Sequence, residues 1–136
     1  MTSEDIAEHR TYAHAHGCAA AVLEQPAGQA AGPALVKIVG PDPICLSFTT
    51  EHGQRDAIVE AEDWKWLTDL AAEPGGAKTS AALQDHADGT ESTVPITVAP
   101  RADRPEEQTL TIGTTVLRLP AGEWKHLLAH QGTYAD

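Results

Sequence analysis

Alternation of apolar and polar residues predicts strands in two stretches of the chain. In the first stretch, apolar residues fall at every second position of three short segments: Val36 and Ile38, then Leu46 and Phe48, then Ala57, Val59 and Ala61. The second stretch repeats the pattern at Ile96 and Val98, then Leu110 and Ile112, then Leu117, Leu119 and Ala121. Alternate side chains of a strand point to one face, so we expect each strand to be buried on one side.

Each stretch of strands leads into a short amphipathic helix. Apolar residues recur at helical spacing in both helices: Trp64, Leu67 and Leu70 in the first, and Trp124, Leu127 and Leu128 in the second. Acidic residues stand in the first turn of both, where the helix dipole favours negative charge: Glu62 and Asp63, and Glu123. A buried tryptophan is the expected anchor of each helix.

An internal repeat connects the two stretches. Residues 59–67 align with residues 119–127 at an offset of 60, and the same offset places Val36 on Ile96. Similarity at a fixed offset indicates a duplication. The sequence therefore predicts an α+β fold of two tandem βββα units, each an antiparallel sheet with one packed helix.

The unit boundaries follow from segments rich in glycine, proline and small residues. Residues 1–33 are expected to hold a short N-terminal helix and a loop. Residues 34–72 form the first predicted βββα unit, and residues 73–93 form a linker. The second unit is predicted over residues 94–136.

Charge and composition exclude several classes of protein. The chain of 136 residues has a formal net charge of −11, and none of its segments is basic, which argues against a duplex-binding protein. It has no apolar run long enough to predict a membrane helix, and its acidic start does not resemble a secretory signal. With only two cysteines, Cys18 and Cys45, we expect free thiols in the cytoplasm.

Candidate catalytic and metal chemistry is sparse. His14, His16 and Cys18 would project from one face of an extended strand, but a structural zinc site needs a fourth ligand from His9 or Cys45. Solvent-facing histidines beside a small buried cysteine are the simpler interpretation. No nucleophile motif surrounds either cysteine. We therefore predict that the protein is not an enzyme and holds no metal or other cofactor.

Trp66 is the residue singled out as a binding anchor. It lies two positions after Trp64, about 200° around a helix, so it should face away from the core that Trp64 enters. It could pack on the other half of the chain or on the N-terminal segment, or it could anchor a partner or a homodimer. The predicted partner-binding residues are Trp66, its acidic neighbours Glu62, Asp63 and Asp69, and its repeat counterpart His126. An apolar anchor with an acidic rim suits a basic protein.

The second helix and its preceding strand resemble a known family. Residues 117–129, Leu-Arg-Leu-Pro-Ala-Gly-Glu-Trp-Lys-His-Leu-Leu-Ala, are similar to the ending of the BldB-like actinobacterial regulatory domain, with Gly122 inserted before the Glu. Residues 57–70 match it less well, and the Arg-Asp-Ser-Lys-like stretch of that family is missing from both copies. The resemblance implies a regulatory or antitoxin-like protein without catalytic residues, whose partner is a protein such as a helix-turn-helix regulator.

A second resemblance supplies the alternative function. Whirly-like and Pur-alpha-like proteins also pair curved sheets with helices in duplicate, and they bind single-stranded nucleic acid. Such binding needs a basic groove and exposed aromatic side chains, of which this chain has few. We therefore expect a protein partner, and we do not expect nucleic acid or membrane binding.

Overall fold

The computed structural model describes residues 3–24, 32–40, 42–50, 53–71, 73–101 and 103–133. Within these residues the chain forms three helices, α1 (Ser3–Ala15), α2 (Ala61–Leu70) and α3 (Glu123–Ala129). The same residues contain nine strands: β1 (Ala19–Glu24), β2 (Gly32–Gly40), β3 (Ile44–Thr50), β4 (Gly53–Val59), β5 (Ala77–Asp85), β6 (Glu91–Pro100), β7 (Gln108–Ile112), β8 (Thr115–Leu119) and β9 (Gly132–Thr133).

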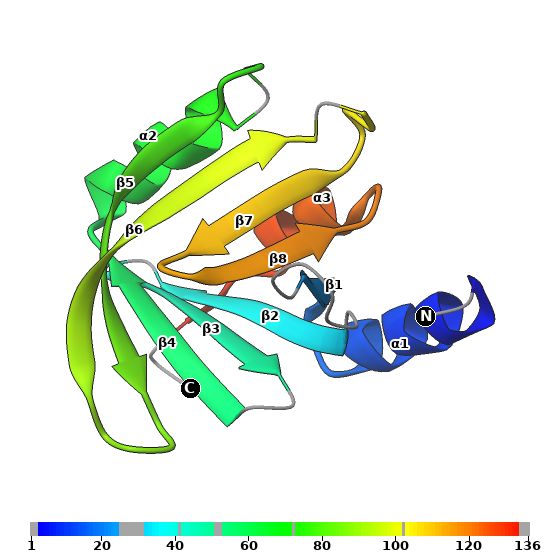
Figure 1. Cartoon of the computed structure of the whole chain (residues 1–136), viewed down its shortest axis with the longest axis horizontal. Helices are drawn as coiled ribbons and strands as arrows, with labels where there is room; N and C mark the ends of the chain where they lie inside the picture. The colour runs from blue at the N-terminus through cyan, green and yellow to red at the C-terminus, as the bar shows by residue number, and fades with distance from the viewer. Residues whose placement is uncertain are drawn as a thin grey trace.

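Strands β1 to β8 close into an antiparallel barrel (Figure 1). Consecutive strands pair from β2 through to β8, and β1 completes the ring because it pairs with both β2 and β8. Val22 of β1 lies opposite Pro33 on one side and Arg118 on the other. The short β9 adds a parallel pairing at the end of β2.

The predicted fold of two βββα units is therefore wrong. Each of α2 and α3 follows four consecutive strands, and these strands belong to one barrel instead of two sheets. The additional strands are β1, in the segment predicted as an N-terminal helix and loop, and β5, in the segment predicted as a linker. Residues 25–31, which hold most of the predicted loop, lie outside the described residues.

Helices and hairpins lie at opposite ends of the barrel. Strands β4 and β8 run in the same direction, so the helices that follow them, α2 and α3, emerge at the same end. Trp64 of α2 and Trp124 of α3 meet there, with ring centroids 6.0 Å apart. The β5–β6 and β7–β8 turns lie at the other end, and in Figure 1 the β5–β6 hairpin projects at the bottom while α2 and α3 lie above.

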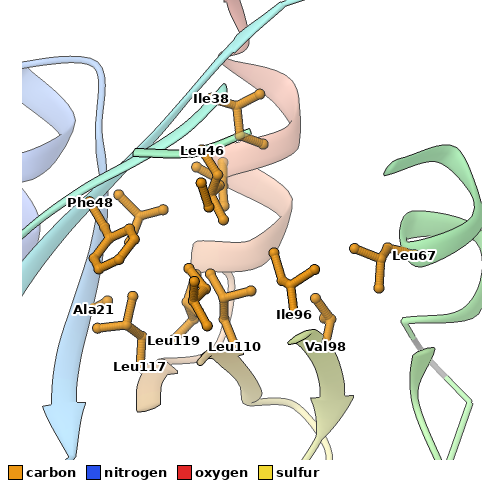
Figure 2. Packing of buried hydrophobic residues seen from close by; sticks show 14 of the residues in the cluster. Ala21, Ile38, Leu46, Phe48, Leu67, Ile96, Val98, Leu110, Leu117 and Leu119 are labelled. Carbon is orange, nitrogen blue, oxygen red and sulfur yellow. The ribbon is translucent and has the colours of Figure 1, made fainter. Parts of the chain in front are cut away.

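Apolar side chains fill the barrel interior (Figure 2). Most of the inward-facing positions predicted from alternation are buried: Val36, Ile38, Leu46, Phe48, Ala57, Val59, Ile96, Val98, Leu110, Ile112, Leu117 and Leu119. The prediction is wrong for Ala61, which is half-buried at the start of α2, and for Ala121, which is exposed before α3. Leu67 of α2 and Leu127 of α3 add to the same core from the helix end. The predicted burial of Trp64 is also confirmed, whereas Trp124, the expected anchor of the second helix, is only half-buried. Among the helices of the described segments, none has the length and apolar character required to cross a membrane.

Candidate functional site

The outer face of α2 presents an exposed tryptophan. Trp64 and Leu67 are the buried residues of this helix, and they turn its inner face toward the barrel. Trp66 is 55% exposed, which confirms the prediction that it faces away from the core. Within the described residues, the other large apolar side chain with comparable exposure is Tyr12 of α1, at 56%.

Acidic residues surround Trp66 on the helix. Glu62 lies four positions before it, Asp63 three before and Asp69 three after, which are the spacings that make helical residues neighbours. Glu62 and Asp69 are exposed and Asp63 is half-buried. Asp69 accepts a hydrogen bond of 2.8 Å from Nζ of Lys65. We call Glu62, Asp63, Trp66 and Asp69 the α2 outer surface.

His126 does not belong to the α2 outer surface. Its ring lies on α3 and stacks between those of His14 and His130, at centroid distances of 3.7 Å and 4.0 Å. Burial lowers the pKa of His126, and the neighbouring His14 and His130 lower it further. The repeat relation to Trp66 therefore does not extend to the surroundings of His126, and its role in partner binding stays a prediction.

Glu123 forms a polar cluster that the sequence interpretation missed. Its side chain is 3% exposed, although it was predicted only as a favourable charge in the first helical turn. It accepts the backbone N–H of Ala20 at 2.7 Å and hydrogen bonds with Nε2 of His14 at 2.9 Å. Nε of Arg10 lies 3.3 Å from its other oxygen. Glu123 thus joins α3 to α1 and β1.

The candidate zinc ligands each have a different partner. His14 binds Glu123, His16 packs against Tyr12 with the rings tilted and their centroids 4.4 Å apart, and Sγ of Cys18 lies 3.6 Å from the carbonyl oxygen of His16. Across the described ranges, no three His, Cys, Asp or Glu side chains form a group that could hold a metal ion. His14 instead ties α1 to α3 through Glu123, whereas His16 is exposed.

Neither cysteine is electrostatically activated. Both are free thiols. Burial, together with the charge of Asp56, raises the pKa of Cys45 to about 11. Burial also raises the pKa of Cys18. A nucleophilic cysteine needs a stabilised thiolate, and these surroundings favour the neutral thiol.

In comparisons with known proteins, no family model, curated protein or solved structure matches this chain. The functional argument therefore depends on the residues and their geometry.

Proposed function

We propose that this chain is a non-enzymatic protein-binding module, regulatory or antitoxin-like, that acts in the cytoplasm through the α2 outer surface. The observation that carries the proposal is the exposure of Trp66 at 55%. Exposing a large indole to water is unfavourable for an isolated protein, and tryptophan is enriched among the residues that dominate binding energy at protein interfaces.

Charge indicates the kind of partner. Residues 60–70 contain four acidic residues and one lysine, in a chain with a net charge of −11. A basic protein surface would be steered toward α2 by this charge, and an acidic one would be repelled. The resemblance of residues 117–129 to the BldB-like domain supports the same class of function, including a helix-turn-helix regulator as the partner.

A quantitative capture experiment tests the proposal. The full chain and its Trp66→Ala variant would be immobilised, and bound proteins from the encoding organism would be identified and then purified for titration. Tyr12→Ala is the matched control, because it removes an equally exposed aromatic side chain from a different helix. We expect Trp66→Ala to weaken binding of a basic partner by about 2 kcal/mol or more, as hot-spot residues do.

Melting temperatures distinguish loss of binding from loss of folding. Trp66→Ala should melt like the unmodified chain, because Trp66 lies outside the core. If the partner binds Trp66→Ala as tightly as the unmodified chain, or if both aromatic variants weaken it equally, the α2 outer surface is not the binding site. Tight, salt-sensitive binding of single-stranded DNA by the purified chain would instead favour the nucleic-acid function.

A further inference from the structure

The hairpin end of the barrel contains a pocket of about 520 Å³. Inward-facing residues of β4 to β8 line it, and we call these the barrel mouth: Arg55, Leu83, Asp85, Val94, Ile112 and Thr115. Pockets for small molecules commonly measure roughly 300–1,000 Å³ and occur in the mouths of barrels. The pocket lies at the opposite end of the barrel from α2 and α3, and it plays no part in the proposed protein binding.

The pocket exists because apolar side chains stop filling the barrel on one side. Along β5 the inward-facing positions change from the buried Ala81 to the half-buried Leu83. Along β6 they change from the buried Ile96 to the half-buried Val94. Small barrels normally fill their interior with side chains, so half-exposed apolar residues at inward-facing positions mark room for another molecule.

Arg55 spans this opening. It comes from β4, and in the closed strand order β4 stands opposite β8. Its Nε donates to Oδ2 of Asp85 at 3.1 Å, and its Nη1 donates to Oγ1 of Thr115 on β8 at 3.2 Å. A guanidinium carries five N–H donors, and these contacts use two of them. The others can serve an acceptor that enters the pocket.

The charges of the barrel mouth select against ions. Asp85 compensates the positive charge of Arg55 at 3.1 Å. Asp88 is a second carboxylate near Arg55, since hydrogen bonds from Thr90 and also the charge of Arg55 lower its pKa. An anion would therefore approach a compensated guanidinium with a further carboxylate nearby. A cation would meet Arg55 itself. An uncharged acceptor such as a carbonyl oxygen meets neither penalty, and an apolar body attached to it would cover Leu83 and Val94.

We propose that the barrel mouth binds a small uncharged molecule with an apolar body and one carbonyl group. The body packs on Leu83, Val94 and Ile112, and the carbonyl oxygen accepts a hydrogen bond from the guanidinium of Arg55. Asp85 acts as the specificity residue, because its charge disfavours a carboxylate at the same position.

Nuclear magnetic resonance titrations of the full ¹⁵N-labelled chain test this proposal with three probes of equal chain length: hexanamide, hexanoate and hexylamine. Hexanamide should cause saturable shifts in the amides of the barrel mouth. Hexanoate and hexylamine should each bind roughly tenfold more weakly than hexanamide. The carboxylate of hexanoate is disfavoured by the charge of Asp85, and the ammonium group of hexylamine cannot accept a hydrogen bond from Arg55.

Variants assign the binding to the barrel mouth. Arg55→Met removes the donors and should weaken hexanamide binding roughly tenfold, the effect of losing a hydrogen bond to a charged group. Arg104→Met, at an exposed position between β6 and β7, is the matched control and should leave binding unchanged. Val94→Phe fills the pocket while keeping Arg55, so it tests the site even if Arg55→Met fails to fold. Asp85→Asn should narrow the difference between hexanoate and hexanamide.

The proposal is overturned if hexanamide causes no saturable shifts in the barrel mouth. It is also overturned if hexanoate or hexylamine binds as tightly as hexanamide, or if Val94→Phe and a folded Arg55→Met both bind hexanamide like the unmodified chain. These outcomes do not depend on Trp66, so they leave the proposed protein-binding function untouched.

Discussion

Replacing Glu123 should destabilise the fold far more than its position in a first helical turn would indicate. In Glu123→Ala the backbone N–H of Ala20 loses the acceptor that it reaches at 2.7 Å. Leaving a buried donor unsatisfied costs about 1–3 kcal/mol. The variant also breaks the contacts with His14 and Arg10, whose side chains remain 34% and 42% exposed and are therefore partly hydrated without their partner. We expect a total loss of about 2–4 kcal/mol, below the full cost of breaking a buried ion pair.

Urea unfolding followed by circular dichroism would measure this loss at neutral pH. Glu123→Gln keeps an oxygen acceptor for Ala20 while removing the charge, so it should cost only about 1 kcal/mol. Asp63→Ala is the matched control, because Asp63 occupies the corresponding place in the repeat and stands in the first turn of α2. Its loss should cost about 0.3–1 kcal/mol, the usual contribution of a charge at a helix start.

Two results would refute this reasoning. If Glu123→Ala and Asp63→Ala cost the same, Glu123 contributes no more than a first-turn charge. If Glu123→Gln costs as much as Glu123→Ala, the hydrogen bond from Ala20 is not the main source of the stability.

Three further predictions concern core packing, pH and thiol reactivity. Trp64→Ala should lower the free energy of unfolding by roughly 3–5 kcal/mol, because it leaves a cavity in the core. Trp66→Ala should change the free energy of unfolding by less than about 0.5 kcal/mol. Equal losses for the two variants in urea unfolding would place Trp66 in the core. The lowered pKa of His126 means that the unfolded chain takes up a proton near pH 6.5 while the folded chain resists it. The free energy of unfolding should therefore fall as the pH drops from about 6.5 toward the folded pKa. In urea titrations between about pH 7.5 and about pH 5.5, His126→Gln should reduce this dependence of stability on pH. An unchanged dependence would exclude His126 as its cause. Cys18 and Cys45, with raised pKa values, should react with iodoacetamide at pH 8 much more slowly than free cysteine, as mass spectrometry would show; rapid labelling of either in the folded chain would contradict the assigned surroundings.

Strands with alternating side chains could be predicted from the sequence, but two strands of the barrel could not. In β1 the residues are Ala-Ala-Ala-Val-Leu-Glu, and five of the six are buried, so there is no alternation to detect. A strand that is covered on both sides reads as a short apolar run, which is ambiguous between helix and strand. In β5 the small residues that follow Pro74 and Gly75 are typical of a linker, yet they pair along nine residues with β6 and β4.

The surroundings of some site residues could likewise be predicted from the local sequence, whereas those of others depend on distant parts of the chain. Exposure of Trp66 follows from its angle to Trp64 on one helix, which is local information. The surroundings of His126 and Glu123 depend on α1, whose residues lie more than a hundred positions earlier in the chain, for example His14. The opposition of Arg55 and Thr115 across the barrel mouth likewise requires a closed barrel, which the predicted pair of separate units did not contain.

Closure of the barrel through β1 has a consequence for how the chain folds. The pairing of Val22 with Arg118 joins the first and the last strands of the ring. Closing so long a loop costs conformational entropy, and few contacts offset that cost unless β2 to β8 have already formed. Such non-local pairing is typical of slowly folding β-proteins. During synthesis, β1 leaves the ribosome long before β8 exists, and until then one of its edges has no strand to pair with. That interval, rather than the finished barrel, is when this protein is most open to pairing with a neighbouring chain.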